Sequence, residues 1–248
     1  MRIAIFSDVH GNLPALETVL EAYRALQPDF YVCLGDVVGY GAFPQQCCDL
    51  VRPLVRYCVI GNHDAAVAGR MDYGYYYDAA RTALDYHASQ LSPENRDWIR
   101  ALPYTEFWED VCFSHGSPID PEAFDYVFNP SQALGLIPHF EALSRVTFMG
   151  HSHLTKSYAL SRNDGHTHVE EVTGPVLSID PEKKYVITVG SVGQPRDNDA
   201  RACFTMYDTE ARTVTFTRLD YDIVRAATAI LQTPSLSPDF GKRLYLGI

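Results

Sequence analysis

The amino-acid sequence predicts an α/β fold that occupies residues 1–248 as one domain. In the first half of the chain, short apolar runs suited to buried strands alternate with segments whose apolar residues have helical spacing. Strand patterns predominate in the last third and finish with an expected antiparallel hairpin. With 248 residues, 46% of them hydrophobic, the chain can bury one sizeable core and needs no second domain.

The individual elements follow from local patterns. The run RIAIF at residues 2–6 is apolar at nearly every position, as expected for a strand covered on both faces. Asn12 can cap the helix that follows this strand. A second helical region, 78–102, is interrupted at Ser92-Pro93, where a new helix can begin. The other expected strands are 30–34, 55–60, 111–113, 146–149 and 185–189, followed by the hairpin strands 202–208 and 213–221.

Composition limits the class of protein. Acidic residues outnumber basic residues by 31 to 20, and the formal charge of −11 disfavours binding to extended nucleic acid. No apolar run approaches the roughly 20 residues of a membrane-spanning helix, and the N-terminal residues lack the pattern of a secretory signal. The six cysteines form no CxxC motif and suit buried, reduced thiols. We therefore expect a soluble cytoplasmic protein that does not associate with membranes.

Polar side chains follow five of the expected strands at the point where each strand ends. The loops are SDVHGN after 2–6, GDVVGYG after 30–34, GNHD after 55–60, SHG after 111–113 and GHSH after 146–149. In open α/β sheets, ligands and active sites gather at the carboxyl ends of the strands. Five of the nine histidines lie in these loops. The other four are expected to be ordinary core or surface histidines: His87, His139, His166 and His168.

The same loops supply a set of side chains that suits a pair of metal ions. The seven candidate ligands are Asp8, His10, Asp36, Asn62, His115, His151 and His153. Carboxylate, amide and imidazole donors without a thiolate suit Mn²⁺, Fe, Co²⁺, Ni²⁺ or Zn²⁺, and we expect Mn²⁺ first. Seven ligands exceed what one catalytic ion uses, so we expect two divalent transition-metal ions, with Asp36 as the bridging carboxylate.

The motifs in residues 8–153 resemble, in their order, those of the calcineurin-like metallophosphoesterase family. They are DxH, GDxxG, GNHD, a single histidine and GHSH. The resemblance implies a two-sheet β-sandwich flanked by helices, which is a four-layer αββα fold. It implies that one ion takes Asp8, His10 and His153 and the other takes Asn62, His115 and His151, while Asp36 bridges them. It also implies hydrolysis of a phosphoric ester through attack by a metal-bridging hydroxide.

His63 matches the family histidine that faces the substrate rather than a metal ion. The resemblance implies that this side chain protonates the leaving-group oxygen or stabilises the transferring phosphoryl group, with a pKa suited to neutral pH. Phosphoprotein phosphatases of the same superfamily carry GDxVDRG and GNHE, where this chain has GDVVGYG and GNHD. Gly39 and Tyr40 thus replace an Asp and an Arg, and losing that Asp changes how His63 is held.

A Ser/Thr protein phosphatase is therefore not expected. The sequence is more similar to the small prokaryotic phosphodiesterases and phosphatases of the family, and we expect a phosphodiesterase acting on a small or nucleotide-type substrate. Phosphomonoesters, simple phosphodiesters, cyclic nucleotides and dinucleoside polyphosphates all stay open as substrates, and so does homo-oligomer formation. The main alternative is a non-catalytic metal-binding scaffold or ligand sensor on the same fold. Such proteins lose metal ligands or the substrate-facing histidine, and neither is missing here.

Two further features lie outside these motifs. The segment GSVGQPRD follows the expected strand at 185–189, so Arg196 is a candidate for contacting substrate phosphate. A salt bridge from Arg196 to Asp197 or Asp199 is the alternative. The tyrosine patch at Tyr73, Tyr75, Tyr76 and Tyr77 is expected to be packed or to face another subunit, rather than to stack on a nucleobase.

Overall fold

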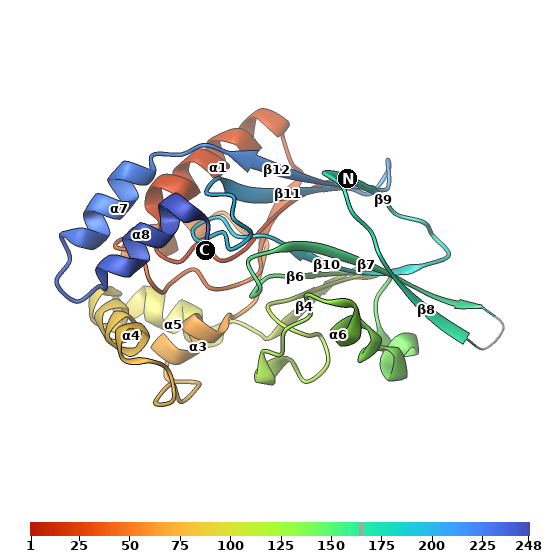
Figure 1. Ribbon diagram of the computed structural model, residues 1–248, viewed down its shortest axis with the longest axis horizontal. Coiled ribbons are helices and arrows are strands. Elements are labelled where there is room, and N and C mark those ends of the chain that lie inside the picture. The colour runs from red at the N-terminus through yellow and green to blue at the C-terminus, as the bar shows by residue number, and fades with distance from the viewer. Residues whose placement is uncertain (164–165) are drawn as a thin grey trace.

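The computed structural model describes residues 1–163 and 166–248. Two mixed six-stranded sheets pack against each other, and helices cover their outer faces (Figure 1). The first sheet has the strand order β3 (Tyr57–Cys58), β2 (Phe30–Cys33), β1 (Arg2–Phe6), β11 (Ala202–Asp208), β12 (Thr213–Leu219) and β9 (Val176–Ser178). The second has the order β4 (Thr105–Trp108), β5 (Val111–Ser114), β6 (Val146–Met149), β10 (Lys184–Val189), β7 (Thr155–Asn163) and β8 (His166–Glu171). The expected four-layer αββα sandwich is confirmed.

The helices fall into groups that cover the two sheets. Those with a bearing on the first sheet and the site are α1 (Leu13–Leu26), α2 (Pro44–Val51), α3 (Asn62–Val67), α4 (Asp78–Gln90), α5 (Pro93–Ala101), α7 (Ile223–Leu231) and α8 (Pro238–Leu246). The outer face of the second sheet is covered by α6 (Pro130–Leu134) and the 3₁₀ segment Ile137–Ala142. Figure 1 shows α1, α7 and α8 gathered on one side of the molecule, and α6 beside the second sheet.

Alternation along the central strands explains why the molecule has four layers. In β1, Ile3 and Ile5 point into the apolar core between the two sheets, where they meet Phe148 of the second sheet. The intervening residues Ala4 and Phe6 point the other way, into the core beneath α1 and α2. Successive side chains of a strand face opposite sides, so a strand that is apolar at every position must be covered on both.

Most of the expected elements are present. Asn12 caps α1 by accepting a hydrogen bond from the backbone N–H of Ala15, and Ser92 caps α5 in the same way at the predicted break. The strand expected at 55–60 is reduced to Tyr57–Cys58, because it pairs only along part of the sheet edge. The expected predominance of strands in the last third is wrong beyond β12, where two helices complete the chain.

The helices α7 and α8 do have local signals. Asp222 caps α7 through the N–H of Arg225, and Ala226, Ala227 and Ile230 form a buried stripe at helical spacing. Short helices with this pattern gain most of their stability from packing, so the pattern alone is a weak predictor of a helix. Here they pack on Tyr40, close to the site.

The topology brings the predicted loops to one place. Strands β1, β2 and β3 are parallel in the first sheet, and β5, β6 and β10 are parallel in the second. Backbone hydrogen bonds join the two sets of loops: the N–H groups of Val192 and Gly193 donate to the carbonyl oxygens of Ser7 and Asp8 at 3.0 and 2.9 Å. The carboxyl ends of both sheets therefore form one shared edge.

Two other expectations concern the whole chain. Among residues 1–163 and 166–248, no helix is long and apolar enough to cross a membrane. All six cysteines are buried and unpaired, and burial raises the pKa of both the Cys112 and the Cys203 thiol to about 12. The thiols are thus kept protonated and away from solvent, as buried structural cysteines usually are.

The core between the sheets gives a stability prediction. Phe148 is fully buried there and its ring stacks on Phe113 with the centroids 6.2 Å apart. We expect Phe148→Ala to lower the free energy of unfolding by about 3–5 kcal/mol, because it leaves a cavity between the sheets. Phe107 on β4 is 59% exposed. Phe107→Ala is therefore the matched control and should change the free energy of unfolding by about 0.5 kcal/mol or less. Urea denaturation of both variants measures the difference; equal effects would contradict this account of the core.

Candidate metal centre and active site

The structure brings all seven predicted ligands to the shared edge of the two sheets. Asp8 and His10 follow β1, Asp36 follows β2, Asn62 begins α3, His115 follows β5, and His151 and His153 follow β6. Every one of these side chains is less than 9% exposed. Three groups of side chains have ligand atoms within 4.8 Å of one another: Asp8–His10–His153, His10–Asp36–His63 and Asp36–His115–His151.

Three of the imidazoles are held by backbone carbonyl groups. The Nδ1–H of His10 donates to the carbonyl oxygen of Val38 at 2.9 Å, and that of His115 donates to Leu34 at 2.6 Å. The Nδ1–H of His153 donates to the carbonyl oxygen of Gln194 at 2.5 Å. Since a carbonyl can only accept, each Nδ1 carries the proton, and in the neutral ring Nε2 presents a lone pair to the centre.

These lone pairs face other acceptors. The Nε2 atoms of His10 and His153 lie 3.1 Å apart, so neither can donate to the other in its neutral form. The Nε2 atom of His115 lies 3.2 Å from Oδ1 of Asn62 and 3.3 Å from Oδ2 of Asp36, and with a pKa of about 10 this ring can carry a second proton and donate it to Asp36. The pair without a hydrogen between its nitrogen atoms is therefore His10 and His153. Buried acceptors that face each other without a hydrogen are unfavourable unless a cation lies between them. The residues therefore fit divalent metal ions, and the mixed oxygen and nitrogen donor set suits transition metals.

Each of the two aspartates accepts a backbone hydrogen bond with one carboxylate oxygen and directs the other oxygen towards the histidines. Oδ1 of Asp36 accepts the backbone N–H of His63 at 2.9 Å, while Oδ2 lies 3.7 Å from Nε2 of His10 and 3.3 Å from that of His115. Oδ2 of Asp8 accepts the N–H of His151 at 3.1 Å. Oδ1 of Asp8 is buried, has no hydrogen-bond partner in the part of the chain that the structure describes, and lies 3.3 Å from Nε2 of His153. An orphaned carboxylate oxygen of this kind also fits a metal ion.

Burial sets the protonation of most of the imidazoles. It holds the pKa of His10, His151 and His153 well below the usual histidine value. Burial acts the same way on His115, but the carboxylates of Asp36 and Asp8 outweigh it and raise the pKa of His115 to about 10. Neutral imidazole is the form that binds a metal ion, so three of the four rings are ready to bind, and a metal ion would compete with a proton for the fourth.

The carboxylates respond to the same charges. Burial opposes ionisation of Asp36, yet the neighbouring His115 outweighs it and holds the pKa of Asp36 well below its usual range. Burial raises the pKa of Asp8 to about 7, despite the opposing effect of His115. Concentrated negative charge in a dry site is costly without a compensating cation. The protonation pattern therefore points to cation binding, as the geometry does.

The backbone at the site is held in a conformation that few residues adopt. Positive φ angles occur at Asp8 (56°), His10 (49°), Asp36 (52°), His151 (64°) and His153 (59°). Left-handed backbone costs about 1–3 kcal/mol at each non-glycine residue, and such strain is concentrated at functional sites. The loops after β1, β2 and β6 thus have a strained backbone, and this backbone directs the side chains to one point.

His63 lies beside the ligands but is held differently. Its ring is packed between Tyr40 and His10, with centroid distances of 4.6 and 5.0 Å, and its Nδ1 is buried without a hydrogen-bond partner among the described residues. A Cβ atom at Gly39 would lie 2.6 Å from this Nδ1. The absence of a side chain at Gly39 therefore makes room for His63, where related phosphoprotein phosphatases have an Asp. Burial lowers the pKa of His63 to about 4, so the expected near-neutral pKa is wrong for the metal-free protein.

His87 holds the loop that carries Gly39. It is fully buried, as expected for a core histidine, but both of its hydrogen bonds go to the loop of the GDVVGYG motif. The N–H of Gly39 donates to Nδ1 of His87 at 2.8 Å, so Nε2 carries the proton and donates to the carbonyl oxygen of Gly41 at 2.7 Å. The N–H of Gly41 in turn donates to the carbonyl oxygen of His10 at 2.9 Å. The sequence offers no signal for this link, because His87 lies in the last turn of α4, 48 residues from Gly39.

Arg196 lies in the loop after β10 and lines the same cleft as Asp36, His63 and His153. Its guanidinium donates to Oε1 of Gln194 at 2.9 Å and lies 5.8 Å from the centre of the Tyr40 ring. The alternative of a salt bridge to a neighbouring aspartate is not found: Asp197 pairs with Arg218, and Asp199 pairs with Arg201. Among the described residues, no carboxylate lies within salt-bridge distance of Arg196.

The cleft above the centre has a volume of about 620 Å³. Its lining includes candidate metal ligands, Arg196 and five aromatic side chains, which we call the aromatic wall: Tyr75, Tyr76, Tyr77, Phe124 and Tyr126. Three members of the tyrosine patch thus line the cleft, whereas Tyr73 lies outside it and donates to Asp85 at 2.6 Å. Tyr126 stacks on the ring of His151, with centroids 3.9 Å apart, and no motif in the sequence indicated this contact.

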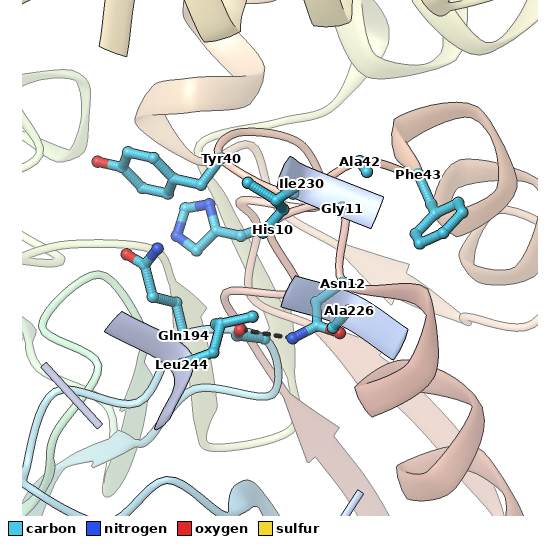
Figure 2. Close-up of a pocket in the computed structure, with 12 residues that line it drawn as sticks. His10, Gly11, Asn12, Tyr40, Ala42, Phe43, Gln194, Ala226, Ile230 and Leu244 are labelled. Carbon is cyan, nitrogen blue, oxygen red and sulfur yellow. Dashed lines mark hydrogen bonds between the residues drawn. The ribbon is translucent and has the colours of Figure 1, made fainter. Parts of the chain in front are cut away.

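A second, very small cavity of about 10 Å³ lies behind His10, with room for about one water molecule. Figure 2 shows His10 and Tyr40 side by side at this cavity, with Ala226, Ile230 and Leu244 of the C-terminal helices on its wall. Figure 2 also shows the hydrogen bond of 2.8 Å that Asn12 donates to the carbonyl oxygen of Gly193. Helices α7 and α8 therefore support His10 and Tyr40 from behind.

Comparison with known proteins identifies relatives that share this arrangement of strands and loops. Residues 1–188 match the model of the calcineurin-like phosphoesterase family. An uncharacterised protein of Methanocaldococcus jannaschii is 33% identical over 249 residues, which cover 99% of this chain and 98% of that protein. Phosphodiesterase YfcE of Escherichia coli is 26% identical over 227 residues, covering 86% of this chain and 91% of that enzyme.

Solved structures give the same result. A metallophosphoesterase from Sphaerobacter thermophilus is 36% identical, with a TM-score of 0.84 over 100% of this chain and 99% of that chain. A hypothetical protein from Pyrococcus horikoshii has a TM-score of 0.78 over 100% of this chain and 98% of that chain. At 21% identity, that second likeness is one of fold alone.

The link through His87 gives a prediction. We expect His87→Phe to lower the free energy of unfolding by about 2 kcal/mol or more, because the N–H of Gly39 and the carbonyl of Gly41 lose buried partners. We also expect weaker metal binding, since the same loop is bonded to His10. Urea denaturation and metal titration measure the two effects, with His139→Phe at an exposed histidine as the control. A variant with unchanged stability and metal affinity would show that the loop does not depend on His87.

Proposed function

This chain belongs to the calcineurin-like phosphoesterase family and is a phosphoester hydrolase, and we propose that it is a two-metal phosphodiesterase. The observation that carries the proposal is the meeting of two groups of buried donors at Asp36. One group is Asp8, His10 and His153, and the other is His115 and His151 with the amide oxygen of Asn62 beside them. Oδ2 of Asp36 points towards both groups, which suits a bridging carboxylate.

Two divalent ions held there would activate a water molecule as the nucleophile and neutralise charge on the phosphoryl oxygens. The seven side chains would hold the ions in a dry site that is fixed before the substrate arrives. The carbonyl groups of Val38, Leu34 and Gln194 keep three of the rings in the binding tautomer. The exposed side of the cleft leaves room for a phosphate ester to approach.

We assign the substrate contacts to His63 and Arg196. His63 is neutral in the buried site, so it would act first as a hydrogen-bond donor to the phosphoryl group or to the leaving-group oxygen. Arg196 has no carboxylate partner within salt-bridge distance among the described residues, and its planar guanidinium suits bidentate contact with a phosphate. One of the three donor groups combines His63 with His10 and Asp36, so His63 as a metal ligand is the competing role.

A diester is preferred over a monoester for two reasons. One relative, YfcE of Escherichia coli, is named as a phosphodiesterase. Arg196 is also the only Lys or Arg among the described residues that line the cleft, which suits the single charge of a diester better than a dianion. We further propose Mn²⁺ as the metal, residues 1–248 as a single domain, and a cytoplasmic location that suits six free thiols.

The bridging role of Asp36 gives a test of metal content. We expect the protein to bind two Mn²⁺ ions per chain and to gain thermal stability on binding. Asp36→Asn keeps an oxygen acceptor for the N–H of His63 but removes the bridging charge, so it should bind one ion or none. Metal analysis after gel filtration measures the ratio, and Asp97→Asn at a 75% exposed aspartate is the control. Two ions retained in Asp36→Asn would refute the bridging assignment.

The activity test compares bis-p-nitrophenyl phosphate with p-nitrophenyl phosphate. We expect hydrolysis with Mn²⁺ that favours the diester and is abolished by a chelator. His63→Ala should lower kcat by about 100-fold, the typical effect of losing one catalytic side chain, while its metal content stays at two ions. His63→Ala that loses metal instead would support the ligand role. A metal-loaded protein that hydrolyses neither ester would favour the scaffold or sensor.

A further inference from the structure

We propose that the aromatic wall of the cleft binds a nucleobase, so that the substrate is a phosphodiester with a nucleoside on one side of its single phosphate. The inference rests on the proposed function, because it assigns a substrate class to the same site. The aromatic wall is Tyr75, Tyr76, Tyr77, Phe124 and Tyr126, as defined above.

The size of the cleft requires more than a phosphate. Its volume of about 620 Å³ lies well within the range of sites that bind drug-sized small molecules, which is about 300–1,000 Å³. A phosphate at the candidate metal centre would occupy one end of this space. The aromatic wall lines the same space, so the ester group of the substrate can fill what the phosphate leaves.

The exposed rings on the wall indicate what that ester group is. Tyr75 is 74% exposed, Tyr77 52% and Tyr126 42%, although all three border the same cleft. Large aromatic side chains that line a cleft and stay exposed are available for stacking, and every nucleobase offers a π-face to such rings. Their hydroxyl groups add donors and acceptors at the edge of the cleft.

The wall is attached directly to the centre. The amide of Asn62 donates to the hydroxyl of Tyr76 at 2.6 Å, and the ring of Tyr75 meets that of Tyr76 at 5.0 Å. On the other side, Tyr126 stacks nearly parallel on His151, at an interplanar angle of 14°. A base bound at the wall would therefore be adjacent to a phosphate bound at the centre, as in one nucleotide unit.

The charges on the cleft limit how many phosphates the substrate carries. Among the described residues, Arg196 is the only Lys or Arg of the lining, and Asp125 adds a negative charge on the aromatic side. A dinucleoside polyphosphate has several phosphates outside the centre, and these would meet no cation there. A diester with one phosphate places its whole charge at the centre and a neutral base at the wall.

The test is equilibrium binding to the Mn²⁺-loaded protein, measured by calorimetry. Uridine 5′-phosphate and ribose 5-phosphate present the same phosphate and sugar, and only the first has a base. We expect uridine 5′-phosphate to bind about tenfold more tightly, as one stacked base typically gives. In Tyr75→Ala and Tyr77→Ala the ratio of affinities should fall towards one, and in Tyr75→Phe it should be kept. Tyr245→Ala, at a 52% exposed tyrosine on α8, is the control.

The inference would be overturned if the natural protein bound uridine 5′-phosphate and ribose 5-phosphate equally tightly. It would also be overturned if the alanine variants left the ratio of the two affinities unchanged. Hydrolysis separates this result from the proposed function. Two phosphodiesters share the p-nitrophenol leaving group, and their second alcohol is uridine in one and methanol in the other. Hydrolysis of both at the same rate would refute the inference alone. Binding that prefers the base, in a protein that hydrolyses no diester, would refute the proposed function and the substrate assignment, and only the binding of a base at the wall would stand.

Discussion

The site depends on one constraint: the unprotonated Nε2 atoms of His10 and His153 face each other beside the buried carboxylate of Asp8. Backbone carbonyls lock both rings, so the lone pairs of His10 and His153 cannot turn away. Such an arrangement has no satisfactory hydrogen-bond pattern and becomes favourable only around cations. The strained loop backbone and the dry floor of the cleft both serve to maintain it, which is why the site resembles a preformed receptor for metal ions.

The sequence alone predicts much of this fold because its strongest signals are local. The run at β1, the cap at Asn12 and the break at Ser92 each follow from neighbouring residues. The convergence of loops was predictable because parallel strands end at a common edge. The split of those strands between two sheets came from the family resemblance, since no local pattern distinguishes one sheet from two.

The features that sequence reasoning missed all depend on contacts between distant residues. His87 and Gly39 are 48 positions apart, and the ring of Tyr126 reaches His151 from a loop with no regular pattern. The low pKa of His63 depends on how deeply the fold buries it, so a motif can identify the residue without giving its protonation state. The candidate ligands could be predicted because they follow from residue types, whereas the contacts and pKa values that depend on packing could not.

The division of the ligands between the two sheets also has a consequence for how the protein acquires metal. Two of the three donor groups, Asp8–His10–His153 and Asp36–His115–His151, combine an aspartate after a strand of the first sheet with histidines after strands of the second. A chain that has folded only one sheet holds neither of these two mixed groups. The proposed two-metal centre would therefore be complete only after the sheets have docked, once His153 and the strands around it have been synthesised and packed.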